Sequence, residues 1–117
     1  MKISEIAQIL NAEICTRNHD NDVNIISACS ADLMSDVMAF SKENAMLLTG
    51  LINPQVIRTA EMMDIKVVVF VRGKKPLDNM IQLAEERGIA LLATDYPLFT
   101  ASGLLYSKGI QGRGDGK

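Results

Sequence analysis

The stretch Ala45–Pro76, AMLLTGLINPQVIRTAEMMDIKVVVFVRGKKP, contains the elements that decide the fold. Two continuous apolar runs, Met46–Leu48 and Val67–Val71, are each followed by a polar residue and a glycine, and a helix-like pattern lies between them. Continuous apolar runs indicate strands that are buried on both faces, as in a parallel sheet covered by helices. The stretch therefore predicts a strand, a helix and a second strand parallel to the first.

The same order of elements repeats along the chain. The polar residues that end three predicted strands are Thr49, Arg72 and Thr94, and they are 23 and 22 residues apart. Each strand end is followed within a few residues by a proline that is expected to open a helix. These prolines are Pro54, Pro76 and Pro97. Successive right-handed β-α-β crossovers explain the period better than a solenoid, because the chain has room for at most four such units.

The flanking sequence supplies the remaining elements. Ser4 can cap a short amphipathic helix, Glu13–Thr16 is strand-like, and Val23–Cys29 predicts a further strand. Residues 1–110 are therefore expected to form a single α/β domain, with a small, mostly parallel β-sheet flanked by helices. Residues 111–117, QGRGDGK, are expected to form a flexible, glycine-rich tail.

The composition limits the class of protein. A chain of 117 residues with 48% hydrophobic and 22% charged residues is typical of one globular domain. A net charge of −2 with interspersed signs and only 4% aromatic residues disfavours a nucleic-acid partner. No apolar run approaches the ~20 residues that cross a bilayer, and the start of the chain lacks a signal-peptide pattern. We expect a cytoplasmic protein that does not bind membranes.

The sequence lacks the motifs of the common catalytic and cofactor sites. Gly73-Lys74-Lys75 comes nearest to a phosphate-binding loop, but it has neither the first glycine nor the final hydroxyl residue of G-x-x-x-x-G-K-[ST]. His19, the only histidine, lies in a polar turn, which argues against a hydrolase triad. Cys15 and Cys29 do not have the spacing of a metal site. We expect no catalytic residues, no metal site and no cofactor.

The polar residues at the strand ends are the candidate ligand-binding residues. In open parallel sheets, ligands bind in the crevice outside the carboxyl ends of the strands. The residues expected at this edge are Asp32, Thr49, Gly50, Arg72, Gly73, Thr94 and Asp95. Arg72 can bind an anion, and the other residues supply hydroxyls, carboxylates and backbone donors. The alternative is that all of them are ordinary turn and cap residues.

Three stretches resemble the DRTGG domain family, and the resemblance extends over essentially residues 4–109. The stretches are Ser30–Val37, Leu48–Gly50 and Val68–Gly73. DRTGG domains resemble the N-terminal domain of HPr kinase/phosphorylase, and they occur alone or joined to phosphotransacetylase or CBS modules. The resemblance implies an α/β fold and an accessory or regulatory role, and it brings no established catalytic residues with it.

The residues that name the family are only partly present. Asp32 matches the aspartate, and Thr49 and Gly50 match the threonine and first glycine. Leu33 and Leu51 replace the arginine and the second glycine. If those two residues hold an anion in other members, this chain binds a different ligand or none.

We expect a non-catalytic regulatory module that senses a small, anionic, nucleotide-like ligand or mediates protein interaction. One alternative is a small enzyme of unfamiliar type that uses Asp32, Thr49 and Asp95; another is a purely structural dimerisation domain. A homodimer is expected because methionine, present seven times, suits adaptable interfaces as well as irregular cores. Gly103 supports this expectation, since a glycine within a helix costs about 1 kcal/mol relative to alanine and permits close approach of another backbone.

Overall fold

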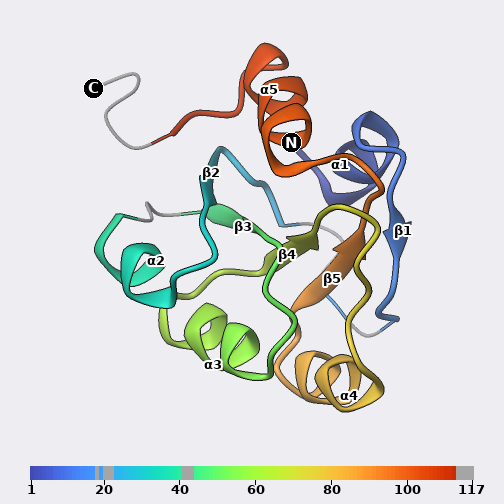
Figure 1. Cartoon of the computed structure of the whole chain (residues 1–117), viewed down its shortest axis with the longest axis vertical. Coiled ribbons are helices and arrows are strands. Elements are labelled where there is room, and N and C mark those ends of the chain that lie inside the picture. Colours follow the sequence, from blue (N-terminus) through green and yellow to red (C-terminus); the bar gives the residue numbers. More distant parts are fainter. Residues whose placement is uncertain (18, 20–22, 41–43, 113–117) are drawn as a thin grey trace.

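The parallel sheet that the sequence predicts forms the centre of the molecule (Figure 1). The computed structural model describes residues 1–17, 19, 23–40 and 44–112. The strands are β1 (Glu13–Ile14), β2 (Ser27–Ser30), β3 (Ala45–Thr49), β4 (Val67–Phe70) and β5 (Ala90–Ala93), in the order β1-β5-β4-β3-β2. Strands β2 to β5 are parallel, and only β1 pairs antiparallel, with β5. The predicted α/β class is confirmed.

The two faces of the sheet are covered by separate helix layers (Figure 1). The helices are α1 (Ile3–Ile9), α2 (Met34–Phe40), α3 (Gln55–Met62), α4 (Asp78–Glu86) and α5 (Leu98–Ser107). Helices α1 and α5 lie on one face, and α2, α3 and α4 lie on the other. Within the described residues, no helix combines the length and apolar character needed to cross a bilayer.

The continuous apolar runs are buried on both faces, as predicted. Every residue of β3, β4 and β5 is buried. Val69 and Leu92 pack in the core under α1 and α5, whereas Val68 and Leu91 pack in the core on the other face. Because side chains alternate across a strand, two apolar faces require an unbroken apolar run.

Two of the three prolines stand where the sequence predicts. Pro54 directly precedes α3, where the Asn53 side-chain oxygen accepts the Gln55 backbone N–H at 2.8 Å. Pro97 directly precedes α5. Pro76 does not open a helix: α4 begins two residues later, after an extended Leu77 whose carbonyl accepts the first helical bonds. Pro76 is instead a buried loop residue.

The chain continues past the predicted domain end as an added edge of the sheet. The Gln111 N–H donates to the carbonyl of Ile26 at 3.0 Å, and the Ala28 N–H donates to the carbonyl of Gln111 at 2.8 Å. These bonds form a parallel bridge between Gln111 and Ser27. Gln111 is therefore paired, although the sequence predicts a tail from 111 onward, and residues 113–117 of that tail lie outside the described residues.

Candidate functional site

The ends of the parallel strands meet along one edge, which we call the carboxyl edge: the loops that directly follow β2, β3, β4 and β5. Backbone hydrogen bonds join these loops to one another. The Val71 N–H donates to the Thr49 carbonyl at 3.1 Å, and the Gly73 N–H donates to the Thr94 carbonyl at 3.0 Å. The three strand ends spaced 23 and 22 residues apart are thus neighbours in space, as the parallel sheet requires.

Asp32 binds the end of the neighbouring strand. Its Oδ1 accepts the Gly50 N–H at 2.8 Å and the Thr49 hydroxyl at 3.1 Å. Hydrogen bonds to an ionised carboxylate are stronger than neutral ones, so this cluster fixes the loop after β3 to the loop after β2. The three residues that match the family name therefore contact one another, and Asp32 lies before α2 rather than on its face.

Both candidate threonines serve the fold. Thr49 is fully buried, and its hydroxyl also accepts the Leu51 N–H at 3.1 Å. Thr94 is buried too, and its hydroxyl donates to the Leu10 carbonyl at 2.7 Å and accepts the Tyr96 N–H at 3.3 Å. Because both hydroxyls are engaged inside the protein, neither is available to a ligand without breaking these bonds.

Gly50 and Gly73 differ in what the backbone requires of them. A Cβ on Gly50 would lie 3.6 Å from Asp32 Oδ1, which is an ordinary van der Waals distance, and its φ is not in the left-handed region. Gly73 has a φ of +72°, and a Cβ there would lie 3.3 Å from Asp95 Oδ1. The fold needs glycine at position 73 but not at position 50.

The backbone of Arg72 lies in the left-handed region, which is unfavourable for a residue that has a Cβ atom. Its φ is 61°, and the other described non-glycine residues with positive φ are all asparagine or aspartate: Asn11, Asn44 and Asp64. Those residue types tolerate the left-handed region, whereas an ordinary side chain there costs roughly 1–2 kcal/mol. The strain is held by the tight turn, in which the Lys74 N–H donates to the Val71 carbonyl at 3.2 Å and the Arg72 N–H to the Tyr96 carbonyl at 2.9 Å.

The Arg72 guanidinium is exposed and makes no hydrogen bond or ion pair with any residue that the structure describes. By contrast, Lys75 in the same loop donates to Glu13 Oε1 at 2.8 Å. That hydrogen bond is the largest cause that raises the pKa of Lys75, and the charge of Asp95 adds a smaller contribution in the same direction. Of these two cations, Arg72 is the one without an internal partner.

The carboxyl edge has a shallow surface. A hollow of about 60 Å³ lies at its β5 side, between Leu10, Asn11 and the loop Thr94–Tyr96. Small-molecule pockets usually measure ~300–1,000 Å³, so a nucleotide-sized ligand would lie across the edge rather than inside it. Among the described residues, no group of histidine, cysteine, aspartate and glutamate side chains has the arrangement of a metal site.

Tyr96 is the edge residue that the sequence analysis misses. Its carbonyl holds Arg72 in place, and its side chain is partly exposed beside Asp95. Its position directly after the Thr94-Asp95 strand end is the signal that identifies it. The structure thus brings together Asp32, Thr49 and Gly50 as one cluster, and the loop Arg72–Gly73 with the loop Thr94–Tyr96 as another.

Comparison with solved structures gives a neighbour of the same fold. The crystal structure of the CBS and DRTGG domains of the regulatory region of Clostridium perfringens pyrophosphatase, in complex with its activator diadenosine tetraphosphate, superposes with a TM-score of 0.77 at 18% sequence identity. The match covers 97% of this chain and 51% of the other, so the chain spans about half the length of that regulatory region. A comparison with curated protein sequences finds no match.

Comparison with protein families agrees with the sequence resemblance. The family model of the DRTGG domain matches residues 5–107, which is most of the chain. The matched segment runs from α1 to the end of α5 and contains the whole sheet and both clusters of the carboxyl edge. The chain belongs to the DRTGG domain family.

Proposed function

We propose that this domain is a non-catalytic regulatory module that senses a small anionic ligand of the nucleotide class at its carboxyl edge, and that it works as a homodimer. The ligand would lie across the loops after β3, β4 and β5. Arg72 would bind its phosphate, the bare, exposed backbone at Gly73 would allow close approach, and Asp95 would accept a ribose hydroxyl.

The observation that carries the proposal is Arg72 itself. The turn after β4 would be more stable with asparagine or glycine at this position, and the chain instead places there an arginine whose charge has no partner among the described residues. Strained backbone positions persist where the surrounding structure enforces them, and they cluster at functional sites. An exposed arginine at the ligand-binding edge of a parallel sheet fits recognition of a phosphate.

The pyrophosphatase regulatory region supports the regulatory part of the proposal. That protein combines a DRTGG domain with CBS domains and is complexed with a nucleotide activator. A regulatory region of which this fold makes up about half thus binds an anionic, phosphate-rich activator. We extend the ligand class, and not the particular nucleotide, to this chain.

The alternative of a small enzyme is weaker. It needs Thr49 as a reacting or binding group, and Thr49 is fully buried with its hydroxyl shared between Asp32 and Leu51. Asp32 and Asp95 follow β2 and β5, which are separated by two strands in the sheet, so they stand roughly 14 Å apart at ~4.8 Å per strand. Such a separation does not favour joint acid–base work on one atom.

Thermal-shift measurements with AMP, ATP and diadenosine tetraphosphate test the proposal. Binding to the folded state raises the melting temperature of the wild type in a concentration-dependent way. Arg72→Glu should abolish the shift while leaving the chain folded. Arg58→Glu is the matched control, because it makes the same charge change at an exposed residue of α3, and it should keep the shift.

Two outcomes would contradict the proposal. Shifts of equal size in the wild type and in Arg72→Glu would mean that the ligand binds elsewhere. The absence of a shift with all three nucleotides at millimolar concentration would exclude this ligand class for the domain and would favour the purely structural alternative.

A further inference from the structure

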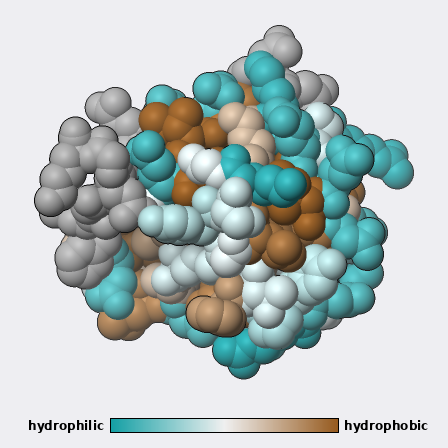
Figure 2. Space-filling model, turned by 90° about the horizontal axis from the view of Figure 1, so that it is seen from above, coloured by the Kyte–Doolittle hydropathy of each residue, from teal (hydrophilic) through white to brown (hydrophobic). Residues whose placement is uncertain are grey.

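Helix α5 exposes a neutral, partly aromatic face. Its sequence, LFTASGLLYS, has no charged residue, and only Ala101 and Leu105 are fully buried beneath it. On the outside, Phe99 is 88% exposed and Tyr106 is 62% exposed. A helix that is apolar on most sides is usually buried on most sides, and this face has no partner among the residues of the single chain that the structure describes. Seen from above, brown and white surface occupies much of the middle of the face formed by α1 and α5 (Figure 2).

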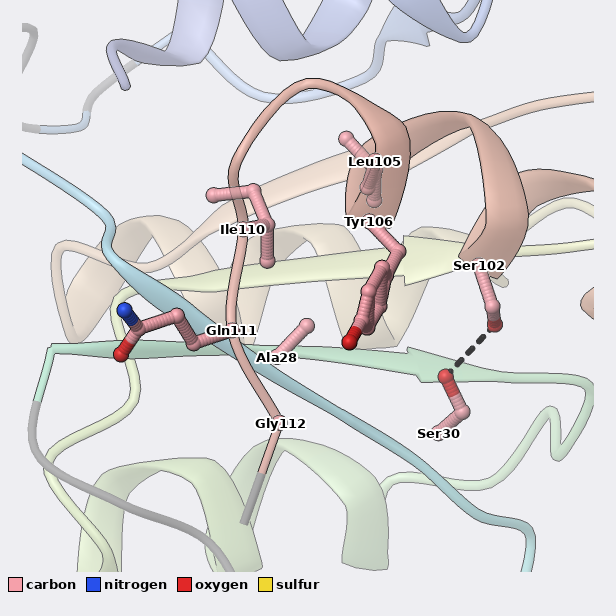
Figure 3. Close-up of a pocket in the computed structure, with 8 residues that line it drawn as sticks. All are labelled: Ala28, Ser30, Ser102, Leu105, Tyr106, Ile110, Gln111 and Gly112. Carbon is pink, nitrogen blue, oxygen red and sulfur yellow. Dashed lines mark hydrogen bonds between the residues drawn. The ribbon is translucent and has the colours of Figure 1, made fainter. Parts of the chain in front are cut away.

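A cavity opens beside this face, between α5, β2 and the segment after α5. We call it the α5 cavity; it measures about 150 Å³, and its lining includes Ala28, Ser30, Ser102, Leu105, Tyr106 and Ile110. Figure 3 shows the Tyr106 ring between α5 and β2, and the hydrogen bond of 2.8 Å between the hydroxyls of Ser30 and Ser102 at one end. The polar side chain of Gln111 also lines the cavity, but most of the exposed lining is apolar and comes from Ala28, Leu105, Ile110 and the Tyr106 ring, so the cavity suits an apolar group.

The exposed ring and the cavity match in size and chemistry. In another protein, an apolar cavity of about 150 Å³ binds benzene, which is the ring that a phenylalanine carries. Phe99 does not fill the cavity of its own chain, since its side chain is almost entirely in solvent. Helix α5 therefore carries an exposed apolar ring and also borders an apolar cavity large enough to hold such a ring.

A two-fold contact uses both features at once. In an isologous interface, the surface patch of each copy meets the same patch of the other. A patch that carries both an exposed ring and a cavity can therefore make the ring-in-cavity contact twice, once in each direction. A two-fold axis near Gly103 places position 99 of one helix opposite positions 106 and 107 of the other. Among the described atoms, nothing lies within 4 Å of where a Gly103 Cβ would be, so the two backbones can approach closely. Because α5 carries no charged residue, the two helices themselves contribute no like-charge repulsion to the contact.

We propose that the chain forms a two-fold dimer through α5, in which Phe99 of each copy inserts into the α5 cavity of the other. The exposed aromatic side chains of two copies would bury on the order of 600 Å², which is about half of the ~1,200 Å² of a stable interface. Thr100 and Ser107 are exposed on α5 and would supply a neutral rim. The proposed homodimer would thus form through α5, and its formation would not require the ligand.

Sedimentation velocity of the full chain over a concentration series tests the dimer. The wild type should be a dimer at tens of micromolar. Phe99→Ala should raise the dimer dissociation constant by about 100-fold or more, because two central aromatic contacts are lost per dimer. Met62→Ala is the control: Met62 is 67% exposed on α3, on the opposite face of the sheet, and its loss should leave the dissociation constant unchanged.

A mixing experiment separates loss of the contact from damage to the fold. Ser102→Phe should fill the cavity of its own chain and weaken the dimer as Phe99→Ala does. A mixture of these two variants restores one of the two contacts, so their heterodimer should form more tightly than either homodimer. A wild type that is monomeric at tens of micromolar, or a dimer that Phe99→Ala leaves intact, would overturn the proposal.

Discussion

At the carboxyl edge, the hydroxyls of Thr49 and Thr94 and the carboxylate of Asp32 all have partners inside the chain, whereas on α5 the Phe99 ring is 88% exposed. In each region one group departs from its surroundings. At the edge it is Arg72, which is strained and has no partner among the described residues, and on α5 it is Phe99, the more exposed of the two exposed aromatic rings. Because Asp32, Thr49 and Thr94 are paired within the chain, Arg72 and Phe99 stand out: the structure describes no contact by which either side chain would stabilise the single chain.

The largest effect on stability is expected at Asp32. Asp32→Ala removes the acceptor of the Gly50 N–H and of the buried Thr49 hydroxyl. Because hydrogen bonds to a charged group contribute roughly 1.5–3 kcal/mol, we expect the free energy of unfolding to fall by about 2 kcal/mol. Urea unfolding measures this change, and Asp32→Asn, which keeps one oxygen acceptor, should lose roughly half as much. An unchanged midpoint in Asp32→Ala would show that the cluster is not structural.

The two edge glycines should respond differently to alanine. Gly73→Ala forces a side chain into the left-handed region and toward Asp95, and should cost about 1–2 kcal/mol. Gly50→Ala meets only ordinary contacts and should change the unfolding free energy by less than about 0.5 kcal/mol. If Gly50→Ala also loses the nucleotide-induced thermal shift, position 50 borders the ligand. Equal stability losses in the two variants would contradict the assignment of their roles.

Arg72→Asn should stabilise the protein. Asparagine tolerates the left-handed region better than arginine, so the free energy of unfolding should rise by about 0.5–1 kcal/mol. The same variant should lose nucleotide binding, since the amide carries no charge. A gain in stability together with a loss of binding is the expected signature of a residue kept for function; a loss of stability would mean that the arginine serves the fold.

The smallest effect is expected from the cysteines, which belong to neither region. Burial is the main cause that raises the thiol pKa of Cys15 and Cys29, and the charges of Glu13 and Asp36, respectively, add to it. The folded state therefore holds these protons more tightly than the unfolded chain. The resulting stability is complete below the ordinary thiol pKa of ~8.5 and is lost as the pH rises through the raised values. The midpoint of urea unfolding should therefore decrease between pH 7 and pH 10. The decrease should be smaller in Cys29→Ala than in the wild type, because one of the two thiols is removed.

The sheet could be predicted from the sequence because each strand is specified by its own stretch of residues. Val67–Val71 and the other apolar runs specify strands buried on both faces, and a fixed period of strand and helix specifies parallel neighbours. The meeting of the strand ends follows from that topology. The match of Thr49 and Gly50 to the family pattern is likewise visible in the sequence.

The features that the sequence could not provide depend on contacts between distant segments. The Thr94 hydroxyl binds Leu10, 84 positions away along the chain, so its structural role is invisible in the local pattern. Gln111, which pairs beside β2, forms part of the wall of the α5 cavity, so the cavity depends on a contact between segments far apart in the chain. The strain at Arg72 arises because its turn is tied to Tyr96, and residue type alone does not reveal it.

The most direct test of the two-region account is a nuclear magnetic resonance titration of the isotope-labelled chain with ATP. The backbone amide signals of Gly50, Arg72, Gly73 and Tyr96 should shift progressively, because they lie along the proposed ligand path. The signals of Phe99 and Tyr106 should stay in place. Shifts confined to α5, or spread evenly over the molecule, would contradict the assignment of ligand binding to the carboxyl edge.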